Sequence, residues 1–399
     1  MPAGGRGGSV DEQVGGNGGG PDRRREAKRY QGLRLKLLPL RLLVGISFPL
    51  LAMAGPSQAL AASLSQRFSL WLLSTAAYFL IFSTAYSLWL LPLNFYQGFL
   101  VEKRFGLSTE GPVSWFGDWL KGLAVSAVIG LPIVSIVYWL LRSFPIYWWV
   151  LAATVVTLFA VVLANLAPVL IYPLFFKFEP LGDEGVRDRL AELARRSGTA
   201  FSGIYRMELS AKSTEAEAML TGMGRTRRII LSDTLLDSYT LDEVEVVLAH
   251  ELGHHAKAHL PLLVAAQTAG TFAALYFMSL LLRLSVGHLG LTSVHDVANL
   301  PLLLAALSFL STLSSPAGNW MSRRLEARAD EFALTLTAKP AAFATAMTKL
   351  ADQNLADLSP HPLVELLLYS HPSVGKRIEA ASRFAAERGL AGPPSVEGA

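Results

Sequence analysis

Two histidines stand four residues apart, with a glutamate directly after the first, in the pentapeptide His250-Glu251-Leu252-Gly253-His254. Residues at this spacing share one face of a helix, so both imidazoles can bind one metal ion. Glu251 can then take a proton from a water molecule held by that metal, as in zinc hydrolases. Because the chain has no cysteine, a zinc ion has only histidine and carboxylate ligands available. The spacing predicts a zinc site with Glu251 as the general base.

A zinc hydrolase needs a third protein ligand and an open position for water. Glu326 is the best candidate, and Asp330 follows it at i+4 on the same face of an expected helix. Asp330 has two possible roles: it can hold a ligand histidine by the second ring nitrogen, or donate a proton to the leaving amine. The chain between His254 and Glu326 is long enough for a hairpin of two membrane spans.

The residues around the pentapeptide also indicate a helix. Thr240 and Glu243 fit a capping box that starts it. Gly253 costs about 1 kcal/mol in a helix interior relative to alanine, which indicates that another backbone approaches closely there. His255 and His259 repeat the i, i+4 spacing, but no glutamate follows His255, so we expect both to be surface or interfacial residues.

Two short apolar runs precede this helix. Residues 204–208 and 228–231 are typical of strands, and the segment Gly222-Met223-Gly224 between them is typical of a turn. A small sheet beside the zinc helix could pair an edge strand with an extended peptide. It could equally do no more than pack on the helix, and the sequence does not separate these alternatives.

The hydropathy of the chain sets the expected fold class. Of its 399 residues 52% are hydrophobic, and the mean hydropathy is +0.38, which is too apolar for an ordinary soluble enzyme. Six apolar stretches have roughly the ~20 residues that a helix needs to cross a bilayer. They run over about 37–61, 70–93, 121–141, 147–172, 260–284 and 297–313. The expected fold is a mainly α, polytopic helical membrane protein with about six spans, a gluzincin-like zinc peptidase site and a small β-sheet.

These features divide the chain into five expected segments. They are a disordered basic N-terminal segment (1–36), spans one to four (37–176), a peptidase segment with the histidine helix (177–259), spans five and six (260–317), and a C-terminal peptidase segment with the third ligand (318–399). The first stretch ends in Ala59-Leu60-Ala61, which is similar to a signal-peptidase site. We expect a retained span there, with a cleaved signal as the alternative.

The distribution of Lys and Arg predicts the orientation. The segment from Pro173 to His259 is rich in basic residues, whereas the one from Ser285 to Asp296 has none. By the positive-inside rule, the active site and both termini face the cytoplasm. The net charge of +4 is not arranged as a nucleic-acid surface, so the expected partners are a peptide or protein substrate and the lipid bilayer, with no nucleic acid.

Further motifs follow one another along the chain in a fixed order. They are Glu102–Ser108, Pro173–Phe175 with Pro180-Leu181, Thr221-Gly222, Arg227–Leu231, Asp233–Leu236, Asn319–Asp330, and His371-Pro372 with Arg377. With these motifs the chain resembles the integral-membrane zinc endopeptidases that include the CAAX prenyl proteases and HtpX.

The resemblance implies roles for the residues of the expected site. It implies that His250, His254 and Glu326 bind one zinc ion and that Glu251 is the general base. It also implies that Asp330 is a second catalytic acid or a supporting one.

The resemblance implies less direct roles for three other residues and shows one departure. Arg324 or Arg323, together with His371, would stabilise the oxyanion or position the substrate. Glu217 stands where the family usually has asparagine before alanine. If that asparagine contacts the substrate backbone, this substitution alters peptide recognition and leaves zinc binding unchanged.

The expected function is therefore that of a zinc metalloendopeptidase similar to the CAAX prenyl endopeptidases. Two alternatives stay open. One is a quality-control protease similar to HtpX that degrades damaged membrane proteins. The other is a non-catalytic membrane scaffold, against which the intact Glu251 argues.

Overall fold

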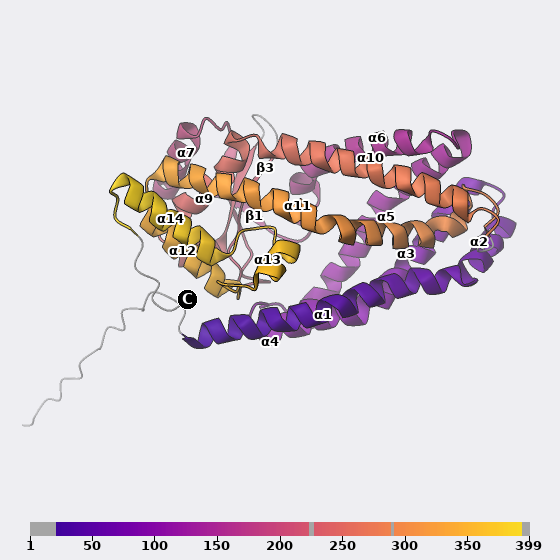
Figure 1. Ribbon diagram of the computed structural model, residues 1–399, viewed down its shortest axis with the longest axis horizontal. Helices are drawn as coiled ribbons and strands as arrows, with labels where there is room; N and C mark the ends of the chain where they lie inside the picture. The colour runs from indigo at the N-terminus through magenta and orange to yellow at the C-terminus, as the bar shows by residue number, and fades with distance from the viewer. Residues whose placement is uncertain (1–20, 223–226, 289–290, 393–399) are drawn as a thin grey trace, which may run out of the picture.

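The computed structural model of the chain describes residues 21–222, 227–288 and 291–392. Long helices run lengthwise through most of the molecule, and a small sheet with shorter helices gathers at one end (Figure 1). The helices are α1 (Pro21–Met53), α2 (Pro56–Arg67), α3 (Trp71–Phe95), the π-helix η1 (Tyr96–Val101), α4 (Glu102–Arg104), α5 (Pro112–Ser143), α6 (Trp148–Leu170), η2 (Tyr172–Leu174), α7 (Glu184–Arg196), α8 (Asp233–Ser238), α9 (Leu241–Ala256), α10 (His259–Ser285), η4 (Val297–Asn299), α11 (Leu300–Thr337), α12 (Pro340–Gln353), α13 (Pro362–Leu368) and α14 (Val374–Arg388).

Six helical stretches within the described residues are long and apolar enough to cross a membrane. They are Asp22–Met53, Trp71–Arg104, Pro112–Ser143, Trp148–Leu174, His259–Ser285 and Val297–Thr337. Their number agrees with the six predicted stretches. Large apolar side chains on them stay open to the surroundings, among them Val128, Leu158 and Leu284, which are 72%, 62% and 75% exposed. Such surfaces are stable against lipid and unfavourable in water.

The structure differs from the sequence prediction at the start of the chain. Residues 1–20 lie outside the described residues, but residues 21–36, expected to be disordered, form the first turns of α1. The Arg23 Nε and Gln31 Nε2 groups donate hydrogen bonds to the carbonyl oxygens of Asp352 and Leu355, at 3.0 and 2.8 Å. Tyr30 is buried beside Leu355. These long-range contacts stabilise a helix that its polar composition does not predict.

The first predicted span also ends earlier than expected. Gly55 has φ of 134°, and Pro56 begins α2, so the helix breaks inside the stretch predicted for residues 37–61. Proline disfavours helical geometry at the residue before it, and glycine tolerates the positive φ.

The predicted sheet is present, with four strands in the order β1-β2-β4-β3. The strands are β1 (Phe178–Pro180), β2 (Gly203–Met207), β3 (Ala218–Thr221) and β4 (Arg228–Ser232). β2 and β4 are parallel, while β1 and β3 add antiparallel at the two edges. Of the predicted turn, Gly222 is described and has φ of 88°, whereas Met223 and Gly224 lie outside the described residues.

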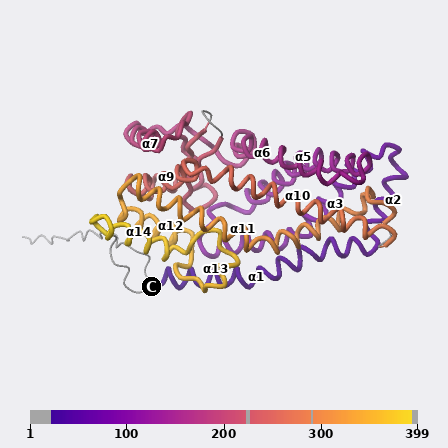
Figure 2. Tube along the Cα trace, turned by 45° about the horizontal axis from the view of Figure 1, so that its top comes forward, coloured from indigo at the N-terminus to yellow at the C-terminus, as the bar shows by residue number. Residues whose placement is uncertain are grey.

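One apolar core joins the sheet to the helices at this end. It gathers side chains from α7, β4, α9, the end of α11, α12 and α14. α10 and α11 form an antiparallel hairpin that leads away from this core and returns to it (Figures 1 and 2). The hairpin brings α11 back against α9, as the sequence predicted, so residues far apart in the chain meet.

Candidate metal centre

α9 carries the two histidines and starts where the sequence predicted. The Thr240 side chain accepts a hydrogen bond from the Glu243 backbone N–H, and the Glu243 carboxylate accepts one from the Thr240 N–H at 2.8 Å. This capping box satisfies two N–H groups at the helix start. α9 is buried over most of its length, and His250 is 7% exposed, so the first predicted ligand lies in a fixed environment.

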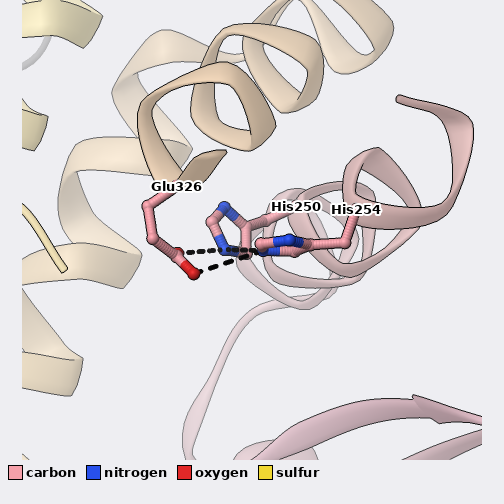
Figure 3. A group of neighbouring side chains, drawn as sticks. All are labelled: His250, His254 and Glu326. Carbon is pink, nitrogen blue, oxygen red and sulfur yellow. Dashed lines mark hydrogen bonds and ion pairs between the residues drawn. The ribbon is translucent and has the colours of Figure 1, made fainter. Parts of the chain in front are cut away.

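His250, His254 and Glu326 form a three-membered group whose ligand atoms all lie within 4.8 Å of one another (Figure 3). The His250 Nε2 atom lies 3.1 Å from Glu326 Oε2 and 3.3 Å from His254 Nε2, and His254 Nε2 lies 3.5 Å from Glu326 Oε1. Ligands placed tetrahedrally around zinc at its usual bond lengths are ~3.3 Å apart. The donor types and the spacing of this group therefore fit a zinc ion.

Gly253 allows the two ligand-bearing helices to approach. A Cβ atom at this position would meet the Cα and carbonyl oxygen of Ala329 at 3.2 Å each, and Phe332 at the same distance. Ala329 lies one helical turn beyond Glu326 on α11. The close backbone approach predicted from this glycine is confirmed, and it sets the separation between His250 and Glu326.

Asp330 lies behind His250, on the side away from the group of ligand atoms. Its Oδ1 is 2.8 Å from His250 Nδ1, and Arg377 donates from Nη2 to Oδ1 at 2.6 Å and from Nε to Oδ2 at 2.8 Å. A carboxylate that accepts from Nδ1–H leaves Nε2 as the metal-binding atom and fixes the ring. Both oxygens are engaged and the residue is 3% exposed, so this geometry favours the first of the two roles left open by the sequence.

In the sequence Arg377 is only part of a motif, and the structure gives it a definite position. Its side chain is 12% exposed and pairs with Asp330 from α14. In the sequence, its spacing after His371-Pro372 indicated a role for this arginine. Spacing alone does not show which carboxylate an arginine contacts.

The position of His259 differs from the one predicted from the sequence. It is 2% exposed, not on the surface, and its Nδ1 lies 3.1 Å from His254 Nδ1. α9 ends before Ala258, whose φ of 53° reverses the chain and returns His259 onto His254. The contact orients the His254 ring with Nε2 toward Glu326.

His255 does not join the group of ligand atoms. It is half-buried and hydrogen-bonds the backbone of Leu220 in β3, with a pKa lowered by burial and by the charge of Arg227. It therefore lies toward the sheet, while His254 points at the ligand group.

Glu251 and His371 lie beside the ligand group. Burial raises the pKa of the Glu251 carboxyl, while the His250 and His254 rings oppose the rise. His371 Nδ1 is 2.8 Å from Glu326 Oε2, and its side chain is 56% exposed. A basic carboxylate and an accessible imidazole thus flank the place where a metal would bind.

Arg323 and Arg324 lie away from the ligand group. Arg324 Cζ stacks 3.9 Å from the centre of the Trp320 ring, and Arg323 donates to backbone carbonyls of α13. Neither has a contact with the ligand group among the described residues. The physical reason is helical geometry, because Arg324 is two residues from Glu326 and points away from the face that carries it. We therefore do not retain Arg324 among the catalytic residues.

β3 is an edge strand next to α9, with Glu217 directly before it. Burial raises the pKa of Glu217, and the charges of Glu215 and Glu251 raise it further. The residue that departs from the expected asparagine therefore senses the charge of Glu251 and lies at the start of the available strand edge.

Comparison with known proteins gives two family matches that together span most of the chain. Residues 180–385 match the model described as Peptidase family M48. Residues 25–177 match the model described as CAAX prenyl protease N-terminal, five membrane helices.

Relatives and a solved structure agree with these matches. The chain is 30% identical over 315 residues to "Uncharacterized metalloprotease YhfN" of Bacillus subtilis, covering 78% of this chain and 74% of that protein. It is 31% identical over 319 residues to "CAAX prenyl protease 1" of Saccharomyces cerevisiae, covering 73% and 68%. The crystal structure of S. mikatae Ste24p superposes with a TM-score of 0.80 at 25% identity, over 90% of this chain and 88% of that one.

Proposed function

The chain belongs to peptidase family M48, and we propose that it is a zinc-dependent endopeptidase whose site is formed by His250, His254, Glu326 and Glu251. Family membership and the six apolar helices make it an integral, multi-pass membrane metalloendopeptidase. The observation that carries the proposal for the site is the set of ligand-atom separations, 3.1, 3.3 and 3.5 Å, among two imidazoles and one carboxylate.

His250 Nε2, His254 Nε2 and one Glu326 oxygen would hold the metal. Two imidazoles with one carboxylate suit zinc, and three protein ligands leave one position for water. Zinc held there would make a water molecule acidic and polarise a peptide carbonyl.

The remaining residues act on protons and charge. Glu251 takes a proton from the attacking water at a carboxylate oxygen and delivers it to the departing amine nitrogen. Its raised pKa makes this carboxylate a stronger base than that of an ordinary glutamate, which favours removal of the proton from water. His371, exposed beside Glu326, donates a hydrogen bond to the developing oxyanion. Asp330 and Arg377 keep the His250 ring in place.

For the substrate, we propose a peptide presented at the membrane, as the names of the CAAX prenyl protease relatives suggest. An extended segment of that peptide would add to the free edge of β3. The positive-inside distribution of Lys and Arg supports a site that faces the cytoplasm.

The test is peptide cleavage by the purified protein in detergent, wild type beside Glu251→Gln and Glu326→Ala. We expect Glu251→Gln to retain bound zinc and lose cleavage, and Glu326→Ala to lose most of the zinc. Cleavage by Glu251→Gln at the wild-type rate would overturn the mechanism, and full zinc retention by Glu326→Ala would remove Glu326 from the ligands.

Substrate choice is tested in the same assay. A prenylated peptide and an unfolded soluble protein are offered separately to the wild type. Preference for the prenylated peptide supports the proposed substrate class, whereas cleavage of the unfolded protein alone favours the quality-control alternative.

A further inference from the structure

The short helix α13 exposes its apolar face and buries its charged residue, which is the reverse of a surface helix in a water-soluble domain. Leu363, Leu366 and Leu367 share one face, at i, i+3 and i+4, and are 60%, 48% and 45% exposed. Glu365, the charged residue of the helix, is 6% exposed and faces the protein. In water this arrangement leaves the leucines unburied, which is unfavourable.

The inward position of Glu365 is held by specific contacts. Its carboxylate accepts hydrogen bonds from the backbone N–H of Ser373 at 3.2 Å and from Lys376 Nζ at 2.8 Å. Rotating α13 to bury the leucines would break both contacts. The outward direction of the leucine face is therefore fixed by the fold.

α13 is hydrogen-bonded to a short stretch of α11, between Asn319 and Arg323. Asn319 Nδ2 donates to the carbonyl oxygen of Leu367 at 2.8 Å, and Arg323 donates to the carbonyl oxygens of Glu365 and Leu366 at 2.9 and 3.2 Å. α11 begins at Leu300, and ~20 helical residues cross the hydrocarbon of a bilayer. The attachment thus lies where the last span leaves the hydrocarbon region, and Figure 1 shows α13 between the long helices and the compact end.

The side chains at this level are those of a membrane interface. Trp320 is 48% exposed, and the Arg324 guanidinium stacks on its ring. Tryptophan with a neighbouring arginine is enriched at the boundary between headgroups and acyl chains. Further toward the start of α11, Phe309 and Leu313 are 58% and 66% exposed, so the apolar surface continues along the span.

We propose that α13 is an interfacial helix that lies on the bilayer, with its leucine face among the upper acyl chains of phospholipids. Three observations support a lipid occupant: the inverted polarity, the attachment to α11 one span length from its start, and the Trp320–Arg324 pair at the same level. The proposal makes no use of peptidase chemistry.

The chain contains no cysteine, so a single introduced thiol labels one site. Leu366→Cys is labelled with an environment-sensitive fluorophore and reconstituted into phosphatidylcholine–phosphatidylglycerol vesicles. Both leaflets contain a phospholipid that carries a spin label on its acyl chain near the headgroup. The matched control is Glu387→Cys, an exposed position on α14 at the compact end of the molecule (Figure 1).

We expect the label at 366 to emit at shorter wavelength and to lose roughly half or more of its emission to the spin-labelled lipid, because interfacial helices sit ~5–10 Å into the boundary. The label at 387 stays unquenched. If the label at 366 is quenched no more than the one at 387, α13 does not touch lipid and the proposal is overturned. An unquenched label with short-wavelength emission means that protein covers the leucines, which also overturns it. Leu363→Cys replaces Leu366→Cys if the latter does not purify as folded protein.

Discussion

Replacing Asp330 with asparagine distinguishes its two possible roles, positioning His250 or protonating the leaving amine. In the structure Asp330 Oδ1 lies 2.8 Å from His250 Nδ1 and 2.6 Å from Arg377 Nη2, while Oδ2 lies 2.8 Å from Arg377 Nε. Asparagine keeps one oxygen and loses the charge. We therefore expect zinc affinity to fall by ~10–100-fold, or about 1.4–2.7 kcal/mol, as is usual when the partner of a ligand histidine is lost.

The same substitution affects stability separately from metal binding. It leaves the Arg377 guanidinium, 12% exposed, without its carboxylate, and breaking a buried pair from one side costs ~3–5 kcal/mol. The double variant Asp330→Asn with Arg377→Met removes both charges. We expect it to recover much of the stability of the metal-free protein and none of the zinc affinity, so the two effects can be measured apart.

The assay is competition for zinc with a chelator, at a pH of about 9 or above, where protonation of His250 no longer opposes metal binding. Cleavage is then measured at saturating zinc. A positioning residue predicts weakened zinc binding and a kcat that returns as zinc saturates. Unchanged zinc affinity with a persistently low kcat would refute the reasoning and assign Asp330 to proton transfer.

Two further predictions follow from the ligand geometry. For Gly253→Ala, the new methyl meets the Ala329 backbone at 3.2 Å, and overpacking of ~1–3 kcal/mol exceeds the ~1 kcal/mol gained in helix propensity. We expect lower thermal stability and weaker zinc binding than for Gly318→Ala, a control on α11 with nothing within 4 Å; equal behaviour of the two would contradict the close approach. For pH dependence, burial alone would lower the pKa of His250, but its hydrogen bonds to Asp330 and Glu326 raise it to about 9 in the metal-free protein. The proton must leave His250 before zinc binds. The apparent affinity for zinc should therefore rise ~tenfold per pH unit up to a pH of about 9 and level off above it. A flat chelator-competition profile between pH ~7 and ~9 would exclude this competition between the proton and zinc.

The central features of the site could be predicted because they depend on local helical geometry. The spacing of His250 and His254 fixes their common face, and Glu326 follows from the need for a third ligand on a second element. Thr240 and Glu243 cap the helix by hydrogen bonds to each other across three residues, so the start of α9 could also be predicted from the sequence.

The features that were not predicted depend on contacts between distant segments or on a break in a helix. His259 was expected to be a surface or interfacial residue because no glutamate follows His255, whereas the positive φ of Ala258 turns the chain back and buries His259 against His254. The helical start of α1 needs Asp352 and Leu355, more than 300 residues away. No local sequence pattern indicates the chain reversal at Ala258 or the long-range contacts of α1.

The break between α9 and α10 and the unbroken length of α11 also explain how the site is joined to the membrane spans. His259 is both the first residue of α10, which is long and apolar enough to span, and the residue that orients His254. Glu326 lies on α11, which continues without a loop from Leu300 to Thr337. Two of the three proposed ligands are therefore set by helices that run into the bilayer, and the third, His250, is set by Asp330 on that same α11. The separations within the ligand group thus depend on how α10 and α11 pack against α9.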